Sequence, residues 1–269
     1  MIETAPKPLP PDQPTVIARS LCLGSLILRG VLERLIQAPD NPTNLAAHKD
    51  FTARLSTWLN AQDFTANFTL DELNALSQAP GTWDEARLAW QFYRIESMGV
   101  LFWVLSIHRD MPAYDMPYEP PNLETLLGWP ADANNNPIDA KLGKFPHVEP
   151  NWFKQVAQLR PATVIAAHRS AAECWQWRAH VAALQRTNVP PPAGQTYEML
   201  IAIAAEEAFE SAAIPRPIEK DFPLFQKPFS QLTEDEAAQA AAIAASRRLA
   251  LEWLCGYATE WDNVSVANW

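Results

Sequence analysis

The sequence predicts an all-α fold, an irregular bundle of about eight main helices, and three features of its 269 residues support this. The chain holds 24 prolines but only 8 glycines, and the prolines gather in clusters that would interrupt helices and strand ladders alike. Between the clusters lie long segments rich in alanine and leucine, whose apolar residues recur with the period of a helix. No segment alternates convincingly, so we expect no sheet.

The starts of several helices are marked by Thr-x-x-Glu capping boxes. In such a box the threonine oxygen accepts an unpaired backbone N–H, while the glutamate bonds back to the threonine N–H. The three boxes are Thr69 with Glu72, Thr82 with Glu85, and Thr233 with Glu236.

Periodicity and these start signals together place the elements in order. The main helices are expected at 15–38, 43–61, 69–79, 83–108, 151–159, 162–187, 196–213 and 233–258, with a short additional helix at 122–128. Residues 109–150 form the longest non-helical region, an ordered loop that either serves a function or wraps the bundle. We expect a proline-rich N-terminal arm at 1–14 and one helical domain over 15–269.

The charge of the chain excludes one class of partner. The net charge is −10, and no basic stripe of the kind that binds nucleic acid is present. The acidity is greatest from Glu198 to Glu236, where nine acidic and three basic residues give −6. This segment either attracts a basic protein partner or forms a solvated surface that keeps the protein soluble.

The cysteines and the N-terminus indicate a cytoplasmic protein. Cys22, Cys174 and Cys255 are scattered without a Cys-x-x-Cys spacing, which argues against a zinc site or a disulfide framework. The N-terminus lacks the pattern of a signal peptide. The longest run of consecutive apolar residues, around Val100 to Leu105, is too short to cross a bilayer, so no membrane association is expected.

No motif predicts a reaction. The sequence has no Gly-x-Gly-x-x-Gly, no phosphate-binding Walker loop, no Gly-x-Ser-x-Gly and no His-Glu-x-x-His. We therefore expect neither a cofactor nor a metal, and the catalytic residues, if any exist, are not defined by motif.

Charged residues inside apolar helices are the strongest candidates for a site. From Ile95 onward the helix 83–108 is apolar on every side, yet it carries Arg94 and Glu96. A carboxylate in such a place either pairs with a cation or takes up a proton. Arg248 and Glu252 pose the same question in the last helix.

We expect arginines from other helices to neutralise Glu96 and Glu252 in one buried charge network. The candidate arginines are Arg29, Arg94 and Arg248, and Asp262 follows the last helix as a further acid that holds the tail or lines a cleft. The aromatic side chains expected to line the network are Trp103, Trp253 and Trp261. Such a network either fixes the register of the helices or forms a ligand or catalytic site.

Three stretches, "RIESMGVLFWVL", "DFPLFQKPFSQLTEDE" and "RRLALEWLCGYATEWDNV", together resemble the bacterial family named domain of unknown function 4272. The likeness spans most of the chain in the same order and is most specific in the last fifty residues. It implies the helical fold and the charge network but no mechanism. The positions that match the family pattern are Arg94, Glu96, Arg248, Trp253, Trp261 and Asp262.

The sequence departs from that family pattern at four places. Tyr93 stands where the family has tryptophan, Arg247 where it has glutamate, and Glu252 where it has asparagine. An Asp-Thr pair expected near the end reads Ala267-Asn268. If the lost aspartate were catalytic in the family, this member would be impaired.

Two functions remain open. The first is a non-enzymatic cytoplasmic interaction protein, a partner-binding or immunity-like module whose acidic C-terminal third masks a basic surface. The alternative is a hydrolase-type enzyme with an acidic cleft, in which Glu96, Glu252 and Asp262 act as general acids and bases. The exposure of these acids distinguishes the two functions.

Overall fold

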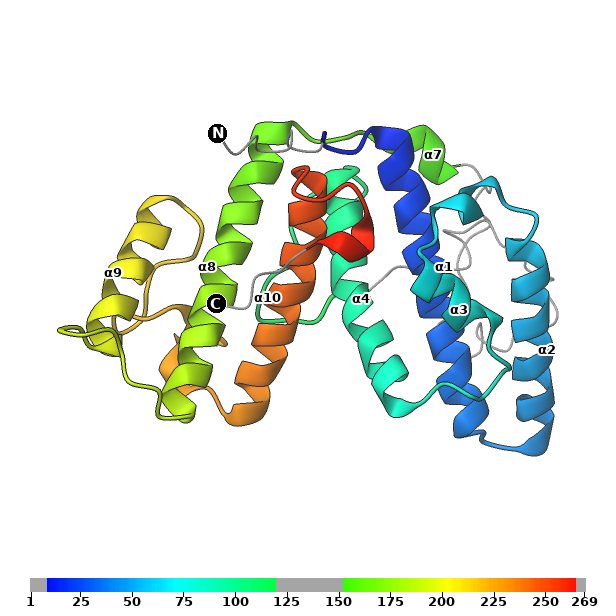
Figure 1. Ribbon diagram of the computed structural model, residues 1–269, viewed down its shortest axis with the longest axis horizontal. Helices are drawn as coiled ribbons and strands as arrows, with labels where there is room; N and C mark the ends of the chain where they lie inside the picture. Colours follow the sequence, from blue (N-terminus) through cyan, green and yellow to red (C-terminus); the bar gives the residue numbers. More distant parts are fainter. Residues whose placement is uncertain (1–8, 120–151, 265–269) are drawn as a thin grey trace, which may run out of the picture. The chain divides into compact units, whose positions relative to one another are not determined.

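The protein is mostly helical in the part that the structure describes. The computed structural model describes residues 9–119 and 152–264. These ranges hold eight α-helices, three short 3-10 helices and one two-stranded hairpin (Figure 1). The predicted all-α, multi-helix fold is thereby confirmed.

Contacts divide the chain into two compact units, each built from separate stretches of sequence. Of the described residues, the N-terminal unit comprises 12–110, 119 and 152–159, and the C-terminal unit comprises 9–11, 111–118 and 160–264. The sequence predicts one helical domain over 15–269, so this division is a feature that it did not reveal.

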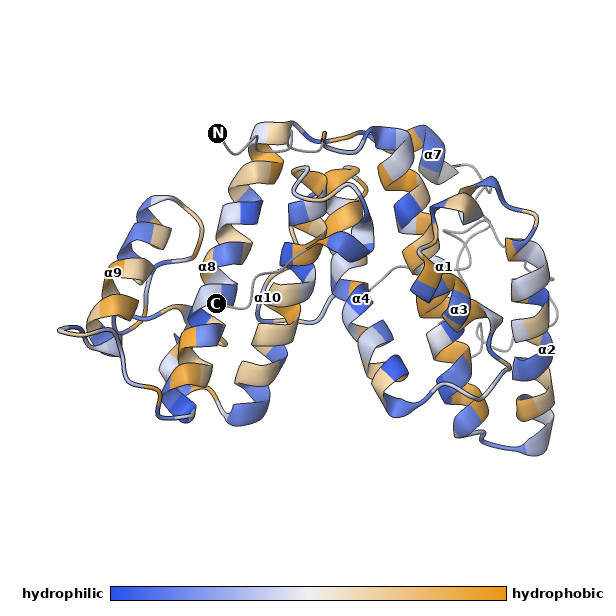
Figure 2. Cartoon of the chain, viewed as in Figure 1, coloured by the Kyte–Doolittle hydropathy of each residue, from blue (hydrophilic) through white to orange (hydrophobic). Residues whose placement is uncertain are grey.

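The N-terminal unit is organised around its first helix. Its elements are α1 (Gln13–Gln37), α2 (Pro42–Leu59), η1 (Asp63–Asn67), α3 (Leu70–Ser77), α4 (Glu85–Val104) and α7 (Trp152–Val156). Helices α2, α3 and α4 and the 3-10 helix η1 all contact α1. Apolar residues occur along most of the length of α1, as Figure 2 shows, so this helix supplies much of the core.

Side-chain caps fix where these helices begin. Asp12 caps α1, Asn41 caps α2, and Thr69 forms the predicted capping box with Glu72 at α3. The box predicted at Thr82 is wrong, because Asp84 caps α4 by accepting a hydrogen bond from the backbone N–H of Arg87. The Thr82 hydroxyl instead donates to the carbonyl of Ala79 in the preceding turn.

One helix of the described residues is long and apolar enough to cross a membrane by length and composition. This helix is α1, and 83% of its most apolar window is buried inside the protein. The core helix of a soluble protein passes the same test, so α1 is weak evidence for a membrane span.

In the C-terminal unit, helix α8 lies between α9 and α10 (Figure 1). Its elements are α8 (Ala162–Arg186), α9 (Tyr197–Glu210), β1 (Pro223–Leu224), β2 (Lys227–Pro228), η2 (Phe229–Gln231), α10 (Glu234–Leu254) and η3 (Trp261–Asn263). The buried rings of Trp175, Phe222 and Phe229 fill the core with small alanines of α8, α9 and α10 around them. The predicted capping box of Thr233 and Glu236 starts α10.

The hairpin was not predicted from the sequence. Its strands are two residues each, with Pro223 opposite Pro228 and Leu224 opposite Lys227. The two residues that join them, Phe225 and Gln226, both have positive φ angles. This is the conformation of the tight turns that connect antiparallel strands, and asparagine and glycine usually supply it.

Each of the eight predicted main helices is present, with ends that differ by a few residues. Residues 109–119 form no helix, in agreement with the start of the predicted loop. The short helix expected at 122–128 and the remainder of the loop at 120–150 lie outside the described residues.

Candidate functional site

The residues that the sequence singled out fall into both units. Arg29, Arg94, Glu96 and Trp103 belong to the N-terminal unit, and Arg248, Glu252, Trp253, Trp261 and Asp262 belong to the C-terminal unit. The contacts within each unit therefore show what each charged group does.

In the C-terminal unit, two arginines and two glutamates form a closed ring between α8 and α10. Arg248 Nε donates to Glu252 Oε1 at 3.1 Å, and its Nη2 donates to Glu173 Oε1 at 3.5 Å. Arg169 Nε donates to Glu252 Oε2 at 2.9 Å, and its Nη1 lies 3.4 Å from Glu173 Oε2. Each arginine thus contacts both carboxylates, and the four charges cancel.

This charge ring (Arg169, Glu173, Arg248 and Glu252) is buried on its α10 side and partly open on its α8 side. The side chains of Arg248 and Glu252 are 5% and 4% exposed, whereas that of Glu173 is 32% exposed. Burial lowers the pKa of Arg169, but the bond to Glu252 and the charge of Glu173 outweigh burial and raise it. Arg169 therefore stays charged, and the contacts of the ring join α8 to α10.

Glu252 contacts an arginine from another helix, as expected, but this arginine is not one of the predicted candidates. Arg169 of α8 comes from another helix, whereas Arg248 lies one turn away on the same helix. Arg169 and Glu173 were missed, although their i, i+4 spacing on one helix repeats that of Arg248 and Glu252 and could have indicated them.

The aromatic residues at the end of α10 form a structural cluster. Trp253 and Trp261 are buried and meet edge to face, with ring centroids 5.3 Å apart. Asp262 is exposed, so the prediction that it belongs to a buried network is wrong. It lies on the same 3-10 helix as the buried Trp261, but its own position on that helix faces solvent.

In the N-terminal unit, Arg94 binds Glu72 of α3. Glu72 is fully buried, and its Oε1 accepts from Arg94 Nη1 at 3.3 Å and from Arg19 Nη2. Its Oε2 accepts the Thr69 backbone N–H at 3.0 Å. One carboxylate thus caps α3 and ties it to α1 and α4.

Glu96 and Trp103 both lie on the buried part of α4. Their exposed fractions are 4% and 2%. Glu96, Glu252 and Asp262 line neither of the two pockets described below.

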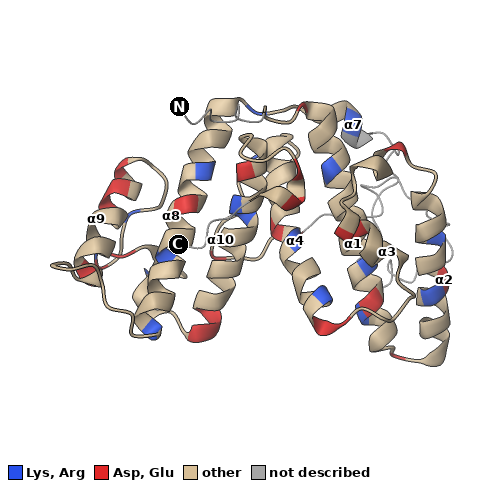
Figure 3. Cartoon of the chain, in the orientation of Figure 1, with Lys and Arg blue, Asp and Glu red and all other residues tan. Residues whose placement is uncertain are grey.

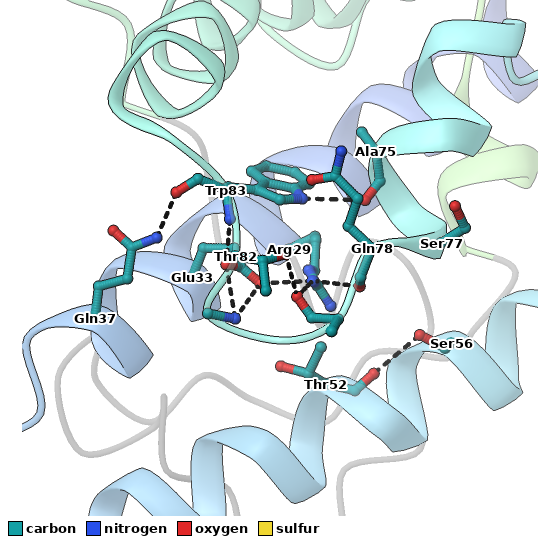
Figure 4. Close-up of polar contacts among 12 residues, drawn as sticks. Arg29, Glu33, Gln37, Thr52, Ser56, Ala75, Ser77, Gln78, Thr82 and Trp83 are labelled. Carbon is teal, nitrogen blue, oxygen red and sulfur yellow. Dashed lines mark hydrogen bonds and ion pairs between the residues drawn. The ribbon is translucent and has the colours of Figure 1, made fainter.

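Arg29 holds the loop between α3 and α4 together with Glu33, one turn further along α1 (Figure 4). The two side chains are 2.5 Å apart and almost fully buried. Arg29 Nη2 donates to the carbonyls of Gln78 and Ala79 at 3.0 and 3.3 Å. Glu33 accepts the backbone N–H groups of Gly81 and Trp83 at 2.8 and 3.2 Å. The pair therefore provides hydrogen-bond partners for both backbone carbonyls and backbone N–H groups of this loop.

Two further buried arginines were not predicted as site residues. Arg178 of α8 donates from Nε and Nη2 to the two oxygens of Asp221 at 2.6 and 2.8 Å. Arg247 of α10 donates to the carbonyls of Pro112, Ala113 and Met116 and so fixes segment 111–118 on the C-terminal unit. Asp221 lies in the "DFP" stretch quoted for the family resemblance, which was the one signal available for it.

The exposed half of α9 differs from all these buried clusters. At about 100° per residue, seven exposed residues cover one half of this helix while Ile201, Ala205 and Ala208 bury the other half. We call this half the α9 surface; it consists of Glu198, Met199, Ile203, Glu206, Glu207, Phe209 and Glu210. Figure 3 shows acidic residues on α9, which has no basic residue.

A groove of about 340 Å³ runs between α8 and α9 beside this surface. Trp177 and the buried Phe222 supply aromatic walls, and Glu173 and Glu207 contribute carboxylates. Burial raises the pKa of the Cys174 thiol, and the charges of Glu173 and Glu207 raise it further. The thiol is therefore a neutral wall of the groove, not a nucleophile.

Metal ligands do not gather anywhere in residues 9–119 or 152–264: no three His, Cys, Asp or Glu side chains are grouped there as a metal site requires. Comparisons with models of known protein families, with curated proteins and with solved structures find no match to this chain. The resemblance to the family of domain of unknown function 4272 stays a prediction from the quoted motifs.

Proposed function

We propose that this protein is a non-enzymatic interaction module of the cytoplasm that binds a basic protein partner through its α9 surface. The main support is that exposed apolar side chains lie there among glutamates, and these glutamates have no ion-pair partner in the described part of the chain. Met199, Ile203 and Phe209 are 45%, 52% and 40% exposed. Exposed apolar residues that gather on one face among polar residues are typical of interaction surfaces.

The charges on this surface favour a basic partner. Four glutamates of one helix repel one another, and a partner that brings lysine or arginine removes this repulsion. The groove beside the surface suits a long cationic side chain, because its stem can lie along Trp177 while its charged end reaches Glu207.

The state of the buried carboxylates also supports a non-enzymatic role. Glu72, Asp221 and Glu252 each accept from arginine, and Glu33 lies against Arg29 while accepting two backbone N–H groups. A general base needs lone pairs that reach a substrate, whereas these oxygens already bond to the protein. The hydrolase alternative requires Glu96, Glu252 and Asp262 around one cleft, and Glu252 is held by two arginines.

A comparison of variants in a pull-down tests this function. Proteins captured from the native organism by the wild type are identified and compared with those captured by Ile203→Ser/Glu207→Lys. Asp110→Lys serves as the control, because it changes the charge at an exposed residue of the N-terminal unit. The proposal predicts a basic protein that the double variant loses and the control keeps. If both variants retain every captured protein, or the lost protein is acidic, the proposal is wrong.

A further inference from the structure

The N-terminal unit contains a pocket whose chemistry differs from that of the α9 surface. It has a volume of about 610 Å³ and lies between α2, α3 and the turn at 78–80, and Arg29 of α1 forms part of its wall. Figure 4 shows Arg29, Thr52, Ser56, Ser77 and Gln78 of its lining. This volume is in the range of small-molecule binding sites, which are mostly apolar with a few placed polar groups.

Arg29 is incompletely satisfied for so deeply buried a cation. Its contacts to Glu33, Gln78 and Ala79 all use Nη2, while its buried Nε–H has no acceptor. Burial lowers the pKa of Arg29, and the charge of Glu33 only opposes this. Glu33 also accepts two backbone N–H groups, so its negative charge is shared among several donors. A second anion near Arg29 would therefore be favourable.

The rest of the described lining offers no competing cation and no carboxylate, and its other polar side chains are hydroxyls and the amides of Asn60 and Gln78. The hydroxyl protons are already used: Ser56 donates to Thr52, Thr65 to Gln62 and Ser77 to Asn74. The side chains of Leu59, Phe68 and Leu76 form an apolar part of the wall. One cationic donor beside this apolar part matches a molecule with one negative end and an apolar body.

We propose that this pocket binds an apolar monocarboxylic acid. The carboxylate lies at Arg29 and accepts a charge-assisted hydrogen bond from the guanidinium, and the hydrocarbon part lies against Leu59, Phe68 and Leu76. No bond is made or broken, so the site is a binding site and does not depend on the α9 surface.

Calorimetric titration with octanoate tests the proposal, with octan-1-ol as the uncharged probe of equal chain length. Arg29 itself is left intact because it holds the turn at 78–80. The blocking variant is Ala53→Trp, which changes an exposed residue of the pocket rim on α2. Its control is Ala46→Trp, an exposed residue two turns earlier on the same helix and outside the pocket.

We expect octanoate to bind saturably to the wild type and to Ala46→Trp, and to bind Ala53→Trp at least about tenfold more weakly. Octan-1-ol should bind the wild type at least about tenfold more weakly than octanoate does, because the alcohol cannot accept the charge-assisted hydrogen bond. Unfolding midpoints of both variants near that of the wild type verify folding. Absence of octanoate binding, equal affinity of the alcohol, or undiminished binding to Ala53→Trp overturns the proposal. A pull-down that fails at α9 leaves these results unaffected.

Discussion

Arg178 of α8 and Asp221 of the loop before β1 form a buried, bidentate salt bridge in which both carboxylate oxygens accept from the guanidinium. Asp221 Oδ1 also accepts the backbone N–H of Phe222 at 2.7 Å, and its Oδ2 that of Ser230 at 2.8 Å. This one carboxylate therefore joins α8 to both ends of the hairpin. It anchors the only sheet structure in the described residues.

Asp221→Asn is predicted to destabilise the protein strongly. Loss of the negative charge leaves Arg178 buried without compensation, which is expected to lower the free energy of unfolding by about 3–5 kcal/mol. Urea unfolding followed by circular dichroism measures this. Asp50→Asn is the matched control, since Asp50 is exposed and its partner Arg54 is partly exposed, and surface pairs contribute about 0–1 kcal/mol. Equal decreases in the free energy of unfolding of the two variants would show that the buried pair stabilises the protein no more than the surface pair does.

Stability is predicted to fall in acid partly through Asp221. Burial alone would raise the pKa of this carboxyl, but the hydrogen bond and charge of Arg178 and two backbone N–H donors outweigh burial and lower it. The folded pKa lies below the unfolded value of about 3.9, so this contribution is full above that pH and disappears as the pH falls through the folded pKa. The free energy of unfolding, measured in urea, should therefore fall more steeply between neutral and acid pH for the wild type than for Asp221→Asn. Parallel curves would contradict this assignment.

At the start of α4, Asp84→Ala is predicted to lower the stability of the protein more than Thr82→Ala does. The Asp84 side chain accepts the Arg87 N–H at 2.7 Å, and loss of such a cap typically costs about 1 kcal/mol. The Thr82 hydroxyl donates to a turn carbonyl on the exposed surface, and its loss should cost less. Thermal unfolding of the two single variants compares them directly, and the reverse order would restore the capping box predicted at Thr82.

The charge ring should behave as one unit. Arg169 and Glu252 each contact both oppositely charged members of the ring, so Arg169→Gln and Glu252→Gln remove overlapping sets of interactions. A double-mutant cycle in urea is expected to give a coupling of about 1–3 kcal/mol. Effects that add within about 0.3 kcal/mol would mean that the two residues contribute independently.

Helices were predictable from sequence because their signals are local. Proline clusters, apolar periodicity and caps such as Thr69 and Thr233 act within a few residues, so the eight helices were found with small errors at their ends. The hairpin was missed because its strands are two residues long and its turn uses Phe225 and Gln226 in place of asparagine and glycine.

Partner choice in the charge clusters was not predictable in the same way. The buried positions of Arg29, Glu96, Arg248 and Glu252 followed from apolar surroundings, which one helix reveals. Which acid contacts which arginine depends on the packing of helices distant in sequence, as the separation of 83 positions from Arg169 to Glu252 illustrates. Asp262 was misplaced because a residue after the last helix carries no periodic signal for burial.

Hydrogen exchange of the protein, alone and with the basic partner captured by the pull-down, tests the proposed function most directly. If the α9 surface is the binding site, the partner slows amide exchange in 197–210 and in the facing part of α8, and leaves α1 and α2 unchanged. Protection that is confined to other segments, with α9 exchanging at its free rate in the complex, would contradict the account.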